Sequence, residues 1–153
     1  ENIVENGKKI DSINDMSNFM SNDGKIILTS AKENDEFDTA IILNQQSLDK
    51  FEHSVKPGGL LIYDPNGITK APTRKDINVY KIAATEKSAE MGMAKVFNMM
   101  VLGGFLKIKP VVTEQYIEEG LKHSLPERHH KLIPTNLDAV AKGKELIEGV
   151  NVL

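Results

Sequence analysis

Two apolar runs in the middle of the chain, and the segment between them, constrain the fold more than any other feature. Residues 38–44 are DTAIILN and residues 60–64 are LLIYD. Continuous runs of this kind are typical of strands that are buried on both faces of a sheet. The segment 45–55 carries apolar residues at intervals of three and four, namely Leu48, Phe51 and Val55. That spacing predicts a helix, and strand, helix and strand in this order predict two parallel strands joined by a right-handed crossover.

The sequence KPGG at 56–59 separates this helix from the second strand. Glycine adopts the left-handed conformation with which many helices end, so Gly58 or Gly59 is predicted to stop the helix. A similar turn precedes a strand in methyltransferases that use S-adenosylmethionine, so a fragment of such an enzyme is an alternative. However, no Gly-x-Gly sequence occurs before residue 58, where the cofactor loop of those enzymes would lie.

The rest of the chain predicts one further strand and then mostly helices, in a single domain that spans residues 1–153. The expected elements are a loop at 65–76, a strand at 77–82, and helices at 84–92, 94–108, 112–125 and 134–150, with Thr85, Thr113 and Thr135 as capping residues. The sequence therefore predicts an α/β fold with a helical C-terminal third.

The helix expected at 94–108 has two adjacent glycines, Gly103 and Gly104, in its most apolar part. Each glycine costs about 1 kcal/mol relative to alanine in a helix, so we expect Gly103 to face an element that approaches very closely. That element is either part of this chain or part of another subunit, and both interpretations stay open. In the second case Asn98, Met99 and Met100 would belong to an adaptable apolar interface.

Composition excludes several classes of function. The net charge is −3 and no basic run is longer than two residues, which argues against a nucleic-acid partner. No apolar run approaches the roughly 20 residues that span a membrane. The chain has no cysteine, so it offers no disulfide, no thiolate nucleophile and no thiolate ligands for an iron–sulfur cluster. These features fit a cytoplasmic protein.

No catalytic group and no metal site can be assigned from the residues. No serine lies in a Gly-x-Ser-x-Gly sequence, and Asp64 and Asp76 are interpreted as solvated loop carboxylates. Because His129 and His130 are adjacent, their side chains should point in different directions, which does not suit two ligands on one helix face. We interpret these two histidines as loop residues at a subunit contact.

Four segments in order resemble one known family. They are DTAIILNQQSLDKFEHSVKPGGLLIYD, INVYKIAATEKSAEMG, KVFNMMVLGGFLK and LPERHHKLIPTN. Together they resemble the gamma subunit of 2-oxoacid:ferredoxin oxidoreductases, most closely the 2-oxoglutarate type, over about residues 24–148.

The resemblance implies a three-layer α/β/α sandwich with a mainly parallel sheet. It also implies a subunit of an enzyme that decarboxylates a 2-oxoacid, forms an acyl-coenzyme A and reduces ferredoxin. Thiamine diphosphate and iron–sulfur clusters would be bound mainly by the partners, which are the alpha, beta and ferredoxin-like subunits. We assign no cofactor to this chain, and a homodimer is expected when the chain is isolated. A non-enzymatic α/β scaffold is the remaining alternative.

The sequence departs from this family near its beginning. A Gly-rich G-x-G-G-Q-G turn and an Arg-Gly-Gly segment are usual there, and neither is present. We therefore expect an N-terminally truncated chain with a break between Ile13 and Ser17. A turn and a strand are expected at 21–30.

Overall fold

The structure is a computed structural model that describes residues 4–5, 8–9 and 36–150. A four-stranded sheet forms the centre of the protein. Its strands are β3 (Phe37–Ile42), β4 (Val55–Tyr63), β5 (Asn78–Lys81) and β6 (Glu148–Gly149), in that spatial order. The first three are parallel, and β6 is antiparallel to β5. A separate antiparallel pair joins β1 (Val4–Glu5) to β2 (Lys8–Lys9). The strand expected at 21–30 and the expected break between Ile13 and Ser17 lie outside the described residues.

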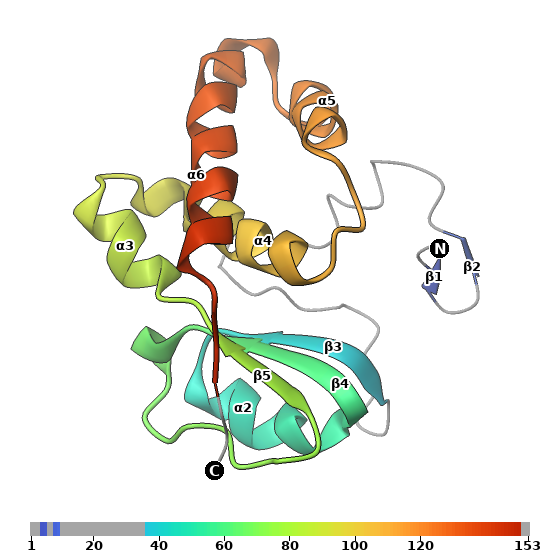
Figure 1. Ribbon diagram of the computed structural model, residues 1–153. Helices are drawn as coiled ribbons and strands as arrows, with labels where there is room; N and C mark the ends of the chain where they lie inside the picture. Colours follow the sequence, from blue (N-terminus) through green and yellow to red (C-terminus); the bar gives the residue numbers. More distant parts are fainter. Residues whose placement is uncertain (1–3, 6–7, 10–35, 151–153) are drawn as a thin grey trace.

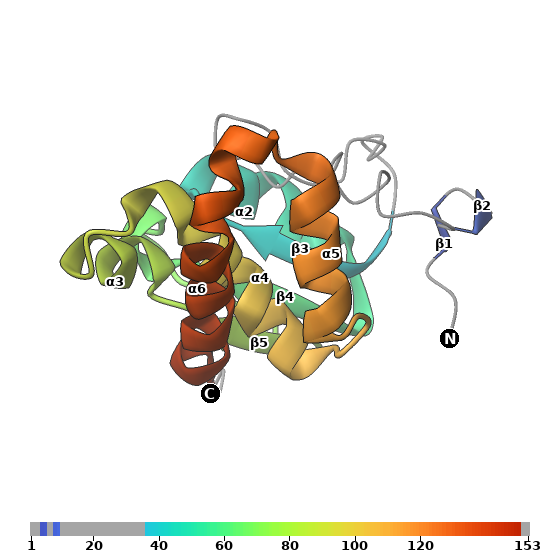
Figure 2. The same ribbon diagram turned by 90° about the horizontal axis from the view of Figure 1, so that it is seen from above.

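Helices cover both faces of the sheet. The α-helices are α2 (Gln45–Phe51), α3 (Ala84–Glu90), α4 (Phe97–Ile108), α5 (Glu114–Ser124) and α6 (Ile133–Leu146). Shorter 3-10 helices are η2 (Glu52–Ser54), η3 (Pro65–Gly67), η4 (Ala94–Val96) and η5 (Glu127–Leu132). Figure 1 shows α2 on one face of the sheet and α4 and α6 on the other, and Figure 2 shows α5 beside α6 in the outer layer. The expected three-layer sandwich and helical C-terminal third are confirmed. No helix in the described part of the chain is long and apolar enough to cross a membrane.

Strand β4 is buried on both faces because its side chains alternate between two cores. Leu60 and Ile62 belong to the core under α4 and α6, and they are 3% and 0% exposed. Leu61 and Tyr63 belong to the core that contains Leu48 of α2. The continuous apolar run in the sequence therefore corresponds to a central strand, as predicted.

Helices α4 and α6 cross with their backbones in contact, and glycines make this possible. A Cβ atom on Gly103 would lie against the carbonyl oxygen of Val140 and 2.8 Å from its carbonyl carbon. A Cβ atom on Gly143 would likewise lie against the carbonyl oxygen of Met100 and 2.6 Å from its carbonyl carbon. The prediction that Gly103 faces a closely approaching element is confirmed, and that element is α6 of the same chain.

The KPGG segment does not end a helix, so this prediction was wrong. Helix α2 ends at Phe51, and β4 already begins at Val55. Phe37 pairs with Val55 but Thr39 pairs with Leu60, so residues 56–59 bulge out of the ladder between β3 and β4. Gly58 has the left-handed φ of 75° that the sequence suggested, but this conformation belongs to the bulge and not to the end of a helix.

The last predicted helix is shorter than expected. It begins at Ile133 and ends at Leu146, after which the chain extends into β6. Thr135 therefore lies inside the first turn and does not cap the helix. Thr113 does occupy the N-cap position of α5, but its side chain makes no capping hydrogen bond.

No α-helix connects the parallel strands β4 and β5, although parallel neighbours usually need one. The connection from Ile68 to Ile77 instead runs beside α2 and is fixed by two side chains of that region, Gln45 and Glu52. Gln45 Oε1 accepts the backbone N–H and the hydroxyl of Thr69 and the N–H of Lys70. Glu52 Oε1 accepts the same three kinds of hydrogen bond from Thr73 and Arg74. This connection is therefore an ordered part of the layer around α2.

Candidate functional site

The carboxyl ends of the parallel strands are the first place to look for a ligand site in an open α/β sheet. Helices α2 and α3 begin at this edge, directly after β3 and β5. The first N–H groups of a helix have no partner within the helix and can bind an anion such as a phosphate. Whether these groups are available decides what the edge can bind.

At each helix one of these N–H groups donates to a side chain of the protein. Asn44 Oδ1 accepts the N–H of Ser47 at 2.8 Å in the first turn of α2. Asp64 Oδ2 accepts the N–H of Thr85 at 2.8 Å and its hydroxyl at 2.7 Å, while Asp64 Oδ1 accepts the N–H of Asn66 at 2.9 Å. The Asp64 carboxylate thus takes one of the N–H groups that an anionic ligand would use at α3 and places a negative charge beside the start of this helix.

Two predictions about this edge were wrong. Asp64 is not a solvated carboxylate, because it is 1% exposed. Thr85 is not the N-cap of α3, because that position belongs to Ala83 and Thr85 donates to Asp64. The nearby loops are also closely packed, since a Cβ atom on Gly67 would lie 3.0 Å from the carbonyl carbon of Leu43. The alternative of an S-adenosylmethionine-dependent methyltransferase gains no support from this edge.

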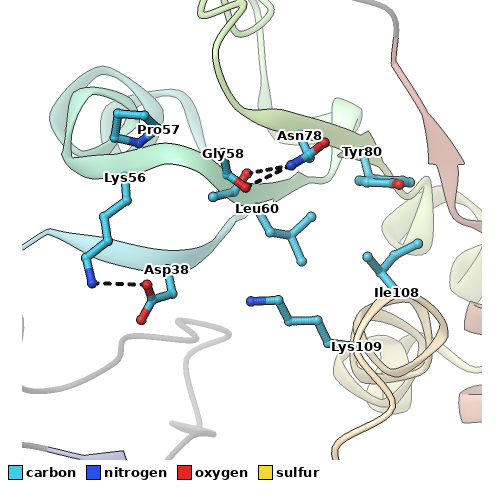
Figure 3. Close-up of a pocket in the computed structure, with 10 residues that line it drawn as sticks. Asp38, Lys56, Pro57, Gly58, Leu60, Asn78, Tyr80, Ile108 and Lys109 are labelled. Atoms are coloured by element: carbon cyan, nitrogen blue, oxygen red, sulfur yellow. Dashed lines mark hydrogen bonds and ion pairs between the residues drawn. The ribbon is translucent and has the colours of Figure 1, made fainter.

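A pocket of about 320 Å³ lies at the opposite end of the sheet. It is lined by the first residues of β3 and β5, by the KPGG bulge of β4 and by the end of α4. Its apolar wall consists of Leu60, Tyr80 and Ile108 (Figure 3). The pocket is an open hollow with one apolar wall and several polar groups on its rim.

The KPGG bulge that forms one side of the pocket is fixed by the start of β5. Asn78 Nδ2 donates to the carbonyl oxygens of Gly58 and Gly59 at 2.9 and 3.3 Å. The N–H of Gly58 donates to the carbonyl oxygen of Asp76 at 2.6 Å. These bonds hold the bulge in one conformation, so the shape of the pocket is set by the fold.

Asp76 is exposed in a loop, as interpreted from the sequence, and it also forms an ion pair. Arg74 donates to both of its oxygens, at 2.9 Å from Nε and 2.6 Å from Nη2. The hydrogen bonds from Arg74 are the main cause of the lowered pKa of Asp76, and the charge of Arg74 adds to it. The side chain of Asp76 is still 53% exposed, so the pair lies at the surface.

Two lysines bring positive charge to the pocket. Lys56 Nζ pairs with Asp38 Oδ1 at 3.0 Å on the rim. Lys109 follows the last residue of α4, and its Nζ donates to the hydroxyl of Thr39 at 2.8 Å. Figure 3 shows its ammonium group directed from the end of α4 toward Leu60 and Asp38.

The residues of α4 that were predicted at a subunit interface are packed within this chain. Met99 and Met100 are 4% and 0% exposed, and Gly103 and Gly104 are also buried. Asn98 is partly buried and accepts the N–H of Met99 with its side-chain oxygen at 2.9 Å. A single chain does not test a subunit contact, so the interface stays a prediction, but the burial of these four residues is already explained within the chain.

His129 and His130 lie in η5, away from the pocket and from the carboxyl edge. His130 Nε2 lies 3.0 Å from the carbonyl oxygen of Lys122 and 2.9 Å from that of Leu125. Because both partners are acceptors, this nitrogen carries the hydrogen and donates it at the end of α5. His129 Nε2 accepts a bond from Arg128 Nε at 3.2 Å. Among the described residues no three acidic or histidine side chains could hold a metal ion.

The roles of Asp64, Asn78 and Lys109 were not predicted from the sequence. The position of Asp64, directly after a buried strand and before a proline, is a usable sequence indication of a residue at the carboxyl edge of a sheet. Nothing in the sequence indicates that Asn78 and Lys109 line the same pocket, because one belongs to a strand and the other follows a helix about thirty residues later.

Comparisons with known proteins agree with this fold. The model of the family described as pyruvate ferredoxin/flavodoxin oxidoreductase matches residues 19–146. The 2-oxoglutarate synthase subunit KorC of Methanocaldococcus jannaschii is 29% identical over 111 residues, which are 71% of this chain and 58% of that protein. The chain thus spans about three fifths of the length of this curated relative.

Two solved structures are also similar. The gamma subunit of a keto/oxoacid ferredoxin oxidoreductase from Geobacter sulfurreducens is 26% identical, with a TM-score of 0.59 over 71% of this chain and 62% of that one. The 2-oxoglutarate:ferredoxin oxidoreductase of Magnetococcus marinus, solved with 2-oxoglutarate, coenzyme A and succinyl-CoA bound, is 25% identical, with a TM-score of 0.63 over 76% of this chain and 21% of that one. These matches confirm the resemblance seen in the four segments, and because the family model covers most of the sequence, the chain belongs to the pyruvate ferredoxin/flavodoxin oxidoreductase family.

Proposed function

We propose that this chain is the gamma subunit of a 2-oxoacid:ferredoxin oxidoreductase that acts on 2-oxoglutarate. In the assembled enzyme the acid is decarboxylated oxidatively, its acyl group is transferred to coenzyme A, and the electrons pass to ferredoxin. The observation that carries the proposal is the similarity to a subunit of 2-oxoglutarate synthase over 71% of the chain. The similarity to a 2-oxoglutarate:ferredoxin oxidoreductase structure supports the same substrate.

We place thiamine diphosphate and the iron–sulfur clusters of this reaction in the partner subunits, and two features of this chain support that assignment. An iron–sulfur cluster is usually held by thiolates, and the chain has no cysteine. The diphosphate of a cofactor would suit a free helix N-terminus, but at α2 and α3 one first-turn N–H group already donates to Asn44 and Asp64, respectively, and Asp64 adds a carboxylate there. When bound in the partners, thiamine diphosphate supplies the decarboxylation chemistry, and we assign no step of it to this chain.

The role of the chain in this proposal is to complete the assembly. The backbone contact between α4 and α6 and the hydrogen-bonded connection beside α2 fix the positions of the helices that form its outer surfaces. We propose the alpha, beta and ferredoxin-like subunits as its partners. Asn98, His129 and His130 remain the proposed contact residues, since they are not fully buried within the chain.

Affinity purification from the native host tests the proposed partners. The full chain carries a tag, and the proteins that remain bound after a wash with 0.3 M salt, about twice the physiological ionic strength, are identified by mass spectrometry. The proposal expects the other subunits of one 2-oxoacid:ferredoxin oxidoreductase in stoichiometric amounts. Isolation of the chain alone, or with unrelated partners, would contradict the proposal and favour a scaffold of another kind.

A further inference from the structure

We propose that the pocket between the KPGG bulge and the end of α4 binds a small organic carboxylate. The carboxylate group would be held by Lys109 and Lys56, and its apolar part would lie against Leu60, Tyr80 and Ile108. This proposal concerns the amino ends of the strands, and it does not depend on the function proposed for the chain.

The first observation is the environment of Lys109. Its side chain is partly buried, and its ammonium group has three hydrogens to donate. One of them is used by the hydroxyl of Thr39 at 2.8 Å, and Lys109 forms no ion pair with any carboxylate of residues 36–150. The two remaining hydrogens are available to an anion in the pocket, toward which Figure 3 shows the ammonium group directed.

The second observation is the ion pair on the rim. The side chains of Lys56 and Asp38 are 43% and 78% exposed, and exposed pairs of this kind contribute little stability. The flexible side chain of Lys56 can therefore leave Asp38 and contact a ligand at low cost. With two lysines and one aspartate, the pocket carries one net positive charge, which suits a ligand with one negative charge.

The surroundings favour a carboxylate over a phosphate. Phosphate sites are commonly built from the N-terminal N–H groups of a helix, but α4 presents its C-terminal end here. The partial negative charge at that end opposes a ligand with two or more negative charges. Leu60 is 3% exposed and forms an apolar wall with Tyr80 and Ile108, and this wall suits a short hydrocarbon chain.

Butyrate is a suitable probe, because it combines one carboxylate with a short apolar chain. The full chain, labelled with nitrogen-15, is titrated with sodium butyrate at constant ionic strength and observed by amide NMR. Sodium chloride and n-butanol serve as controls for salt and for the apolar chain. We expect saturable shifts that centre on the amides of Gly58, Gly59 and Lys109, and no saturable response to either control.

Variants of two lysines separate binding from a purely structural role. Lys109→Met should weaken butyrate binding by about tenfold or more, because it removes a charge-assisted hydrogen bond. Lys109→Arg should retain most of the binding. Lys107→Met is the matched control, since Lys107 is exposed on the last turn of the same helix, and its affinity should equal that of the wild type.

Three results would overturn the proposal. The first is a linear, non-saturable response to butyrate, and the second is equal affinity in the wild type and in Lys109→Met. The third is an absence of butyrate binding together with a loss of subunit assembly in Lys109→Met, which would assign the pocket to an acidic side chain of a partner. An unchanged amide spectrum away from the pocket would verify that each variant is folded.

Discussion

Replacing Gly103 with alanine tests how α4 and α6 are held together. Alanine normally stabilises a helix by about 1 kcal/mol relative to glycine, so the substitution would be favourable if Gly103 faced open space. In this protein the new methyl group would lie against the carbonyl oxygen of Val140 and 2.8 Å from its carbonyl carbon. Both atoms belong to the backbone of α6, so the two helices must move apart to accommodate it.

The expected change in the free energy of unfolding for Gly103→Ala follows from these opposing effects. Overpacking of a well-packed core costs about 1–3 kcal/mol, and the rigid backbone neighbour places Gly103→Ala at the upper end of this range. Subtracting the gain in helix propensity of about 1 kcal/mol leaves a net loss of about 2 kcal/mol. The adjacent Gly104 provides a matched control, because a methyl group there would first meet the flexible end of Ile82, 2.5 Å away at Cδ1. Gly104→Ala should therefore change the stability by less than about 1 kcal/mol.

Urea unfolding of the full chain, followed by circular dichroism, measures these differences. The double variant Gly103→Ala with Gly143→Ala adds a further check, because both methyl groups separate the same two helices. Once one methyl group has moved the helices apart, the second should cost less than it does alone, by about 0.5 kcal/mol or more. A Gly103→Ala variant as stable as the wild type, or more stable, would refute the close-contact explanation.

Substitutions at three further positions test individual contacts. Asp64→Ala removes a buried carboxylate that accepts both donors of the partly buried Thr85, so it should lower the free energy of unfolding by about 1–3 kcal/mol in urea. A change below about 0.5 kcal/mol would contradict this role. The pKa of Glu114 is lowered mainly by its hydrogen bond from Lys144 and also by the charge of Lys144. This pair therefore stabilises the fold at neutral pH, and its contribution is lost as the pH falls through the lowered pKa of Glu114. Lys144→Met should return the pKa of Glu114 to its ordinary range in a carboxyl NMR titration, and an unchanged pKa would be the contrary result. Glu52→Gln should preserve the connection beside α2, but Glu52→Ala should speed hydrogen exchange at the amides of residues 73 and 74. Equal exchange in both variants would show that the Glu52 side chain does not hold the connection.

Those parts of the fold that depend on local periodicity could be predicted from the sequence. The apolar runs at 38–44 and 60–64 identified two parallel strands, because a strand buried on both faces needs apolar residues at nearly every position. The cost of glycine inside a helix identified the close approach at Gly103 without any knowledge of its neighbour. That the neighbour is α6 could not be predicted, since the contact joins segments far apart in the sequence.

The predictions that were wrong have a common physical cause. In each case the conformation or the contacts of a residue depend on a segment that lies elsewhere in the chain. Gly58 adopts the expected left-handed conformation, but pairing with β3 and bonds from Asn78 make it part of a bulge. Asp64 resembles an ordinary loop acid until α3 is placed beside it. The segment after Leu146 has no strand pattern of its own, and it becomes β6 because β5 offers a free edge there.

The central claim is that this chain serves a 2-oxoglutarate:ferredoxin oxidoreductase. The most direct test is the coenzyme A-dependent reduction of ferredoxin by the complex purified from the native host, with 2-oxoglutarate as substrate, before and after the chain is removed by immunodepletion. The account predicts that the intact complex reduces ferredoxin with 2-oxoglutarate, that depletion removes this activity together with the partner subunits, and that other 2-oxoacids are slower. Full activity remaining in the depleted fraction would contradict it.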